Sequence, residues 1–72
     1  GDTPNEPLDV LALDRALTEL EQVDPRAAEV VLLRTFGGMS VDEVAEALEV
    51  SDRTVKRAWR FSRVFLAKRL ED

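Results

Sequence analysis

Apolar residues recur along the chain at three- and four-residue steps, in blocks that helix-breaking residues separate. The first block predicts an amphipathic helix over residues 8–23. Asp24 and Pro25 mark the start of a second helix over residues 25–36, because Asp caps helices and Pro suits their first position. The positions expected on the inner face of this second helix are Ala28, Val31, Leu32 and either Thr35 or Phe36.

A glycine pair, Gly37 and Gly38, is expected to close the second helix, since glycine adopts the left-handed conformation without a steric penalty. Ser40 then stands three residues before Glu43, which is the spacing of a capping box and predicts a short third helix over residues 41–48. The apolar stripe of this helix consists of Val44, Ala45 and Leu48.

Ser51 is expected to cap a longer fourth helix over residues 52–70, with Asp52 near the positive end of its dipole. The stripe predicted to be buried on this helix is Val55, Ala58, Trp59, Ser62 and Leu66. The predicted fold class is therefore all-α, a compact bundle of four helices at about 8–23, 25–36, 41–48 and 52–70.

The last two predicted helices have the spacing of a helix-turn-helix. Ala45 supplies the small residue that a close helix crossing requires, and Val55, ten positions later, locks the second helix. The side chains expected to fill the space between the two helices are Leu48, Val50 and Trp59. Glu49 stands where glycine is usual at the turn, which has an energetic cost if its φ is positive. In a DNA-binding helix-turn-helix the second helix lies in the major groove.

Net charge at first argues against a nucleic-acid partner, since the formal total is −5. Its distribution reverses that interpretation. Residues 1–50 hold three arginines against twelve carboxylates, whereas residues 51–72 hold seven lysines and arginines against three carboxylates. A basic helix on an acidic body is typical of a module that offers one face to phosphates. The alternative is a solvated helix whose charges only keep it in solution.

The composition excludes several classes of site. The 72 residues include no cysteine and no histidine, which rules out disulfides and the usual zinc sites. Without a histidine base or an arrangement of paired carboxylates, neither catalysis nor a cofactor is expected. No apolar run approaches the roughly 20 residues that span a bilayer, and residues 1–7 lack the features of a signal peptide. We therefore expect no membrane partner and a cytoplasmic location.

The expected domain organisation is simple. Residues 1–7, GDTPNEP, contain two prolines and no periodicity, so they are expected to be a disordered linker or a cloning remnant. Residues 8–72 are expected to form one helix-turn-helix domain, close to the lower size limit for a single core. The sequence is expected to be a fragment of a longer protein.

The segment DPRAAEVVLLRTFGGMSVDEVAEALEVSDRTVKRAWRFSRVFL resembles region four of bacterial sigma factors, especially the extracytoplasmic-function (ECF) group. The resemblance covers residues 8–70 and is most specific in the order DPR, apolar helix, GGxS, xxEVAExLxVS and xTVKR. It implies a helix-turn-helix that binds the −35 element of double-stranded promoter DNA. It also implies docking on the β flap of core RNA polymerase and, in many members, masking by an anti-sigma factor. Such a domain is expected to be a monomer that does not initiate transcription alone.

The resemblance places the best contact candidates at the start of the fourth helix. Lys56 and Arg57 occupy the base-reading and phosphate positions of the family, and Arg60 lies one turn further on. The full set of candidate DNA-binding residues is Ser40, Arg53, Thr54, Lys56, Arg57, Arg60 and Arg63.

The other candidates have both a functional and a structural interpretation. Arg53 and Thr54 are expected at backbone phosphates near the helix start, and Ser40 is expected to present amides to another phosphate. Alternatively, Ser40 and Thr54 only support helix caps, and Arg63 pairs with a carboxylate of the body.

Two positions depart from the pattern of the family. Ala58 and Phe61 stand where arginines are common, which leaves the promoter sequence undetermined. Phe61 and Phe65, at i and i+4, form a stripe that is expected to pack against the first helix. The alternative is an exposed Phe61 that touches a thymine methyl group or a protein partner.

Three functions remain open from the sequence. The leading one is a sequence-specific DNA-binding domain of a sigma factor. The second is a protein-interaction module for an anti-sigma factor or a polymerase surface. The third is the effector domain of a response regulator, which shares the helix-turn-helix but normally lacks the first helix and the DPR and GGxS arrangement.

Overall fold

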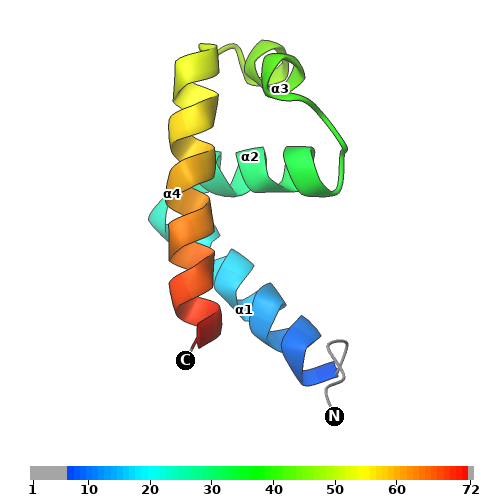
Figure 1. The fold of residues 1–72 in the computed structure, drawn as a ribbon, viewed down its shortest axis with the longest axis vertical. Helices are drawn as coiled ribbons and strands as arrows, with labels where there is room; N and C mark the ends of the chain where they lie inside the picture. The colour runs from blue at the N-terminus through cyan, green and yellow to red at the C-terminus, as the bar shows by residue number, and fades with distance from the viewer. Residues whose placement is uncertain (1–6, 72) are drawn as a thin grey trace.

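The computed structural model describes residues 7–71, and in that range every regular element is an α-helix (Figure 1). The helices are α1 (Pro7–Val23), α2 (Pro25–Thr35), α3 (Val41–Leu48) and α4 (Asp52–Glu71). The all-α prediction is confirmed, with boundaries that differ by one residue at most. The predicted linker lies outside the described residues except for Pro7, which begins α1.

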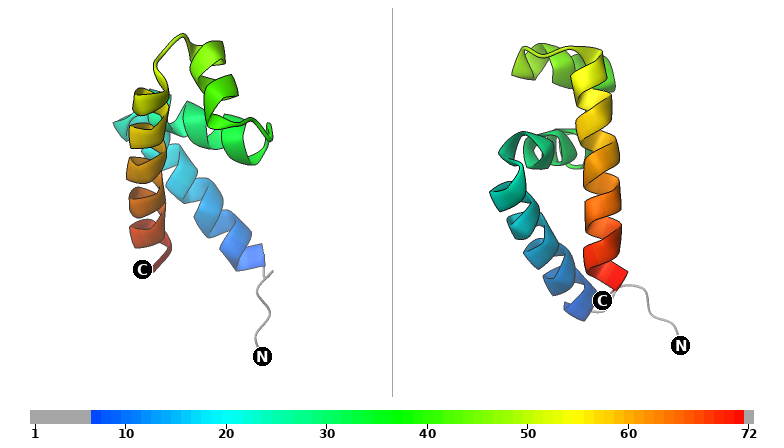
Figure 2. Two further views of the ribbon diagram at one scale, coloured as in Figure 1. Left: turned by 45° about the horizontal axis from the view of Figure 1, so that its top comes forward. Right: turned by 90° about the vertical axis from the view of Figure 1, so that its left-hand side faces the viewer.

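The long helix α4 runs along the long axis of the molecule, and the other three helices lie against it (Figure 1). α3 lies at the end where α4 begins, α2 crosses the middle, and α1 descends toward the end where α4 finishes. Figure 2 shows that α1 and α2 diverge from their junction at Asp24. The extents of the molecule, 42 × 23 × 15 Å, reflect this elongated arrangement.

The junction between α1 and α2 is a single residue with two functions. The backbone N–H of Asp24 donates to the carbonyl of Leu20 at 2.7 Å, which completes the last turn of α1. Its carboxylate accepts from the backbone N–H of Ala27 at 3.1 Å, which caps α2, and Pro25 occupies the first helical position. The chain therefore reverses while Asp24 pairs one of the free amides at the α2 start.

The glycine pair that ends α2 is required for two different reasons. Gly38 adopts a left-handed conformation with φ of 65°. A Cβ atom at Gly37 would lie 2.6 Å from the carbonyl oxygen of Leu33, so a larger residue would force the backbone to shift. After this turn the N–H of Met39 donates to the same Leu33 carbonyl at 3.1 Å.

The predicted capping box of α3 is present. The N–H of Ser40 donates to Oε1 of Glu43 at 2.9 Å, and the N–H of Glu43 donates to Oγ of Ser40 at 3.1 Å. The helix ends at Glu49, whose φ of 58° and ψ of 46° are left-handed. This is the conformation for which glycine is usual at the turn. Ser51 then caps α4 by accepting the N–H of Thr54 at 3.1 Å.

The core consists of two hydrophobic clusters that α4 joins. The buried residues of the first are Leu20, Ala27, Ala28 and Val31. Those of the second are Val30, Val44, Ala45 and Val55, with Leu48 and Val50 packed against them as predicted. Ala58 and Trp59 of α4 pack against both clusters.

Ser62 is the fully buried polar residue between α4 and α2. Its hydroxyl lies 2.8 Å from the carbonyl oxygen of Ala58, one turn earlier, and 3.3 Å from that of Ala27 in α2. A small side chain here allows the two helices to approach closely, and its hydrogen bonds offset the cost of burying a polar group.

The predicted inner face of α2 is wrong in its second half. Leu32 is 46% exposed, Phe36 is 73% exposed and Thr35 is also exposed. The buried residues of α2 are Ala27, Ala28, Val30 and Val31. Because α1 diverges from α2 at Asp24, it does not cover the outer side of the last turn (Figure 2).

The left-handed Glu49 predicts that glycine would stabilise the fold at this position. A non-glycine residue in this conformation costs on the order of 1 kcal/mol, so Glu49→Gly is expected to raise the free energy of unfolding by about 0.5–1 kcal/mol. For a domain of this size that corresponds to a rise in Tm of about 2–8 °C, measured by circular dichroism.

Glu46→Gly is the matched control, because Glu46 is exposed and lies inside α3. It is expected to lower the free energy of unfolding by about 1 kcal/mol. Equal destabilisation by the two substitutions would contradict the assignment of strain to Glu49.

Candidate nucleic-acid interface

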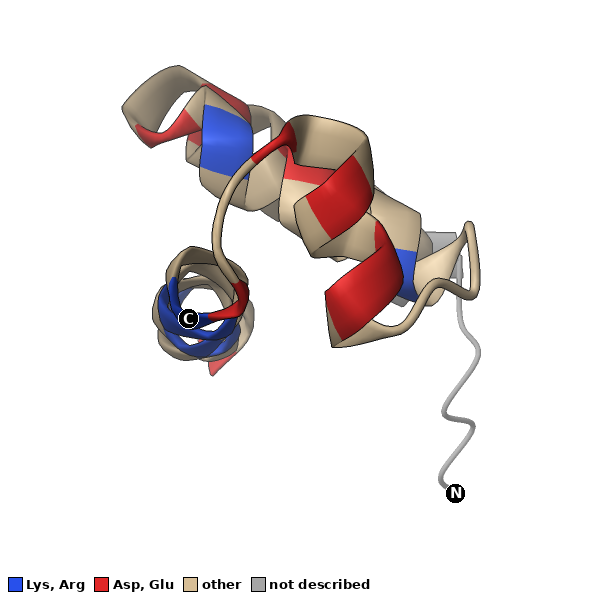
Figure 3. Ribbon diagram, turned by 90° about the horizontal axis from the view of Figure 1, so that it is seen from above, with Lys and Arg blue, Asp and Glu red and all other residues tan. Residues whose placement is uncertain are grey.

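Four of the seven candidate residues lie together on the outer face of α4. Arg53, Lys56, Arg57 and Arg60 are all exposed and line one shallow depression of about 380 Å³. Their spacing of i, i+3, i+4 and i+7 places them on one helix face, opposite the buried Val55. Seen from above, α4 is mostly basic whereas α3 carries acidic residues (Figure 3).

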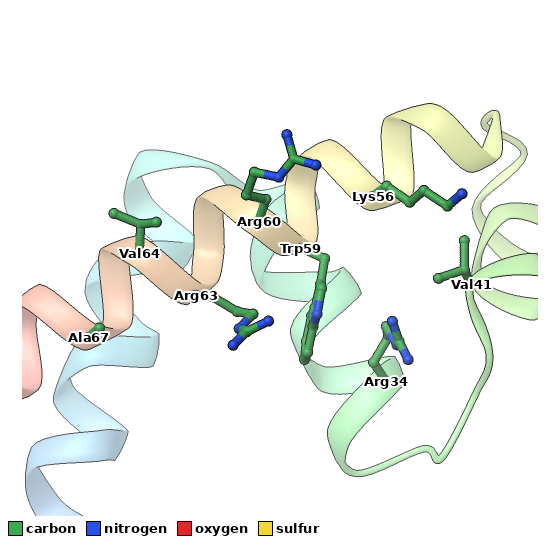
Figure 4. Close-up of a pocket in the computed structure, with 8 residues that line it drawn as sticks. All are labelled: Arg34, Val41, Lys56, Trp59, Arg60, Arg63, Val64 and Ala67. Carbon is green, nitrogen blue, oxygen red and sulfur yellow. The ribbon is translucent and has the colours of Figure 1, made fainter.

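A second basic cluster occupies a groove of about 490 Å³ between α2, the start of α3 and α4 (Figure 4). Its four cationic residues are Arg34, Lys56, Arg60 and Arg63. We call this the Arg34 groove. Lys56 and Arg60 belong to both clusters, so the basic surface continues from the outer face of α4 to the last turn of α2.

Arg34 is held in place by an aromatic contact. Its guanidinium carbon lies 4.8 Å from the ring centroid of Trp59, within the range of a cation–π interaction. Its Nε is buried, and within the described part of the chain it has no hydrogen-bond partner. This N–H can therefore donate to a group that enters the groove.

The Arg34 groove favours an anion. Its remaining lining residues are apolar, Val41, Trp59, Val64 and Ala67, and among the described residues no carboxylate lines it. Among residues 10–71, whose side chains the structure describes, Arg63 forms no ion pair with a carboxylate of the body, and the ion pair between α4 and α1 joins Arg69 to Glu19 at 2.6 Å. An approaching phosphate would therefore meet positive charge that no carboxylate in the groove neutralises.

Ser40 and Thr54 line neither of the two basic clusters, and their polar groups are partly engaged. The N–H of Ser40 donates to Glu43, so the amide that Ser40 itself was expected to present is already bonded. The hydroxyl of Thr54 lies 3.0 Å from that of Ser51. Thr54 is two residues from Lys56 and points away from it, but it lies one turn before Arg57, with which it lines a groove.

One acidic pair lies beside the basic face. Asp42 is in the first turn of α3 and Asp52 is in the first turn of α4. A hydrogen bond with Asp42, together with the negative charge of that neighbour, raises the pKa of the Asp52 carboxyl above its usual value, while Lys56 acts in the opposite direction. The basic surface therefore ends at this acidic pair, at the start of α4.

The two phenylalanines of α4 behave differently. Phe65 is half-buried and packs against the first hydrophobic cluster, whereas Phe61 is 40% exposed. Their ring centroids are 5.9 Å apart. Phe65 therefore packs as predicted, whereas Phe61 is exposed.

The family model for "ECF sigma factor" matches residues 2–72, nearly the whole chain. The chain belongs to the ECF sigma factor family. Neither a curated protein nor a solved structure is similar enough to this chain to count as a match. The family assignment gives this sigma factor chain a DNA-binding role in transcription initiation, and it favours that role over the effector domain of a response regulator. None of the helices in residues 7–71 is long and apolar enough to cross a membrane.

Sequence analysis missed Arg34 as a member of the sigma factor's basic surface. It appeared only as one of three arginines in the acidic part of the chain. No local pattern marks it, because its partner Trp59 is 25 positions away and the two meet only when α2 crosses α4.

The Arg34 groove predicts how the fluorescence of Trp59 is quenched. Since the chain has a single tryptophan, its emission reports on this groove alone. Relative to the quenching of free N-acetyltryptophanamide by each ion, iodide is expected to quench Trp59 more strongly than caesium at equal ionic strength, because the surrounding cations raise the local anion concentration.

Two substitutions test whether iodide quenching depends on the charge of the groove or on the total charge of the chain. Arg63→Gln is expected to lower the Stern–Volmer constant for iodide, whereas Arg15→Gln, which alters an exposed arginine of α1, should leave it nearly unchanged. Caesium quenching as strong as iodide quenching would contradict the electrostatic description of the groove.

Proposed function

We propose that this ECF sigma factor domain recognises the −35 element of a promoter by placing the start of α4 in the major groove. The observation that carries the proposal is the cluster of four exposed cations on the outer face of the second helix of a helix-turn-helix. The buried face of the same helix is anchored by Val55 at the α3 crossing, which fixes the direction of the exposed face.

The basic residues are assigned two roles by their position along α4, which rises 1.5 Å per residue. Arg53, Lys56 and Arg57 lie within the first two turns of α4, the part of a recognition helix that reaches base edges. Arg63 lies about 15 Å further along the helix than Arg53, which exceeds the roughly 12 Å width of the major groove. We therefore assign base contacts to Lys56 and Arg57, and phosphate contacts to Arg53 at the helix start and to Arg63.

Arg34 and Arg60 are two further proposed phosphate contacts. Both line the same groove as Arg63, and Arg34 reaches it from α2 rather than α4. Contacts from two helices to one DNA strand would fix the orientation of α4 on the duplex. The Ser40 hydroxyl and the Thr54 side chain are proposed as lesser phosphate contacts, because their caps already use part of their hydrogen-bonding capacity.

We assign docking on core RNA polymerase to a separate surface of the domain. The element of the polymerase proposed to contact this surface is the β flap. Leu32 of α2 and Phe36, the C-cap of that helix, are at i and i+4, and they are 46% and 73% exposed. Each is two residues from Arg34, which faces α4, so they point away from the DNA-binding face. An exposed apolar pair on that side can contact polymerase while α4 contacts DNA.

The proposed interface predicts strongly salt-dependent binding to a labelled 30-base-pair duplex, measured by fluorescence anisotropy. Each neutralised phosphate contributes about −0.9 to the slope of log K against log salt concentration. Arg34→Gln is expected to reduce the magnitude of this slope by about 1, and Lys56→Glu/Arg57→Glu is expected to abolish measurable binding.

Arg15→Gln and Arg15→Glu are the matched controls for charge, since Arg15 is exposed on α1 and outside both basic clusters. They should retain the slope of the parent chain. Loss of binding in the controls equal to the loss in the α4 variants would show that total charge, and not this face, determines binding.

The proposed polymerase surface predicts a different variant phenotype. Leu32→Glu/Phe36→Ser is expected to weaken binding to core polymerase at least about tenfold in a pull-down titration, because each exposed apolar side chain buried in an interface is worth roughly 1.5–3 kcal/mol. Affinity for the duplex should remain within about twofold. An unchanged polymerase affinity would place the docking surface elsewhere.

A further inference from the structure

The Arg34 groove has features that a contact with a DNA phosphate leaves unused. Its volume of about 490 Å³ lies in the range of pockets that bind small organic molecules. Half of its lining residues are apolar, namely Val41, Trp59, Val64 and Ala67. A phosphate group needs none of these apolar side chains, so the groove offers a ligand more than electrostatic attraction.

The apolar wall extends beyond the cations along α4. Figure 4 shows Arg34 and Arg63 on the two sides of the Trp59 ring, with Val64 and Ala67 further along the helix. Val64 is 55% exposed, and Ala67 is exposed as well. The apolar part of a ligand that lay on this end of the groove would remove exposed apolar surface from water, which favours binding.

The cationic part of the groove is longer than a single phosphate group. Lys56 and Arg63 are separated by about 10.5 Å along α4, at 1.5 Å per residue, and Arg60 lies between them. Arg34 approaches from α2, and its buried Nε has no hydrogen-bond partner in the described part of the chain. A head group with two phosphates can therefore contact more of these cations than one phosphate can, and arginine binds phosphate oxygens in a bidentate manner.

Two simpler ligands fit the groove less well. Inorganic phosphate would leave the apolar wall exposed to water. A neutral apolar molecule would cover the wall but would leave four like charges in one groove uncompensated, and these charges repel one another. The lining therefore favours a ligand that combines several negative charges with an apolar part.

We propose that the Arg34 groove binds an organic diphosphate. Its two phosphate groups contact Arg34, Arg60 and Arg63, and its apolar part lies on Val64 and Ala67. Nucleoside diphosphates and prenyl diphosphates share this chemistry. Because the same cations are the proposed phosphate contacts of the promoter, a bound diphosphate displaces the duplex. This regulation rests on the proposed function, whereas the ligand site does not.

The test compares ligands that have both features of the proposed occupant with ligands that have one. ADP, geranyl diphosphate, inorganic pyrophosphate, adenosine and geraniol are each titrated into the 72-residue chain. Binding is followed by the emission of Trp59, the single tryptophan, and the site is mapped by amide chemical shifts.

ADP or geranyl diphosphate is expected to bind at least about fivefold more tightly than pyrophosphate, which has the charge but cannot cover Val64. Adenosine and geraniol, which lack the diphosphate, are not expected to bind. The largest shifts are expected at Arg34, Trp59 and Val64. The tighter of the two organic diphosphates identifies the source of the ligand as a nucleotide or a lipid precursor.

Val64→Ser is the main variant, because Val64 is exposed and serine and valine have similar helix propensities. It is expected to weaken the preferred organic diphosphate at least about threefold, and pyrophosphate and duplex affinity should stay within about twofold. Arg63→Gln is expected to weaken every diphosphate at least about fivefold. Arg15→Gln, which removes an exposed arginine of α1, is the matched control and should stay within about twofold.

Three results would overturn the ligand site. The first is pyrophosphate binding as tightly as both organic diphosphates, or no binding by any diphosphate. The second is a loss of affinity in Arg15→Gln equal to that in Arg63→Gln. The third is a set of shifts centred on Arg53 and Arg57 of the outer face of α4.

A competition experiment separates this proposal from the proposed function. The preferred organic diphosphate is expected to displace a labelled duplex at a lower concentration than pyrophosphate does. A ligand that fills the groove without displacing the duplex would contradict the proposed regulation. If the chain binds no duplex, the DNA-binding proposal fails, while the titrations and Val64→Ser still decide whether the groove binds an organic diphosphate.

Discussion

Trp59 packs against both hydrophobic clusters of the domain, and its ring also holds the guanidinium of Arg34. The orientation of α4 depends on this contact, because the side chain joins the α1–α2 cluster to the α2–α3–α4 cluster. A helix anchored on one side by Trp59 and Val55 has its opposite side fixed toward solvent. The basic face is therefore a consequence of how the core is built.

Close helix packing depends on small residues at the crossings. Ala27 and Ala28 of α2, Ala45 of α3 and Ser62 of α4 are all buried, and each lies where two helices meet. This packing lets a chain of 72 residues form a core with only a few large apolar side chains. It also brings Arg34 of α2 to the side of α4, so that one groove receives charge from two helices.

Charge segregation gives the domain distinct surfaces. The basic residues of α4 form the outer face and the Arg34 groove, whereas the exposed apolar pair of Leu32 and Phe36 points away from them on α2. Repulsion between the acidic body and DNA would oppose other docking orientations, which helps to select the α4 face. A further groove between the start of α2 and α4 differs from both, because it combines the apolar Pro25, Ala58 and Phe61 with the cationic Arg26 and Arg57.

Local rules in the sequence predicted the helices, because their signals need no knowledge of distant residues. The Ser40–Glu43 capping box, the Asp24 cap and the left-handed Glu49 all involve residues within three positions or a single backbone conformation. Three features could not be predicted this way. The exposure of Leu32 and Phe36 depends on where α1 diverges, the Arg34 contact depends on the crossing of α2 and α4, and the exposure of Phe61 depends on how far α1 covers α4.

The central claim is that the start of α4 reads bases, and selection of duplexes from a random pool tests it most directly. At about 100 mM salt the chain is expected to enrich one short consensus from the pool. Arg57→Gln should relax that consensus at defined positions, whereas Arg34→Gln should weaken binding and preserve the consensus. The assignment of base recognition to α4 would be contradicted if the chain enriched no consensus, or if Arg57→Gln enriched the same consensus as the parent chain.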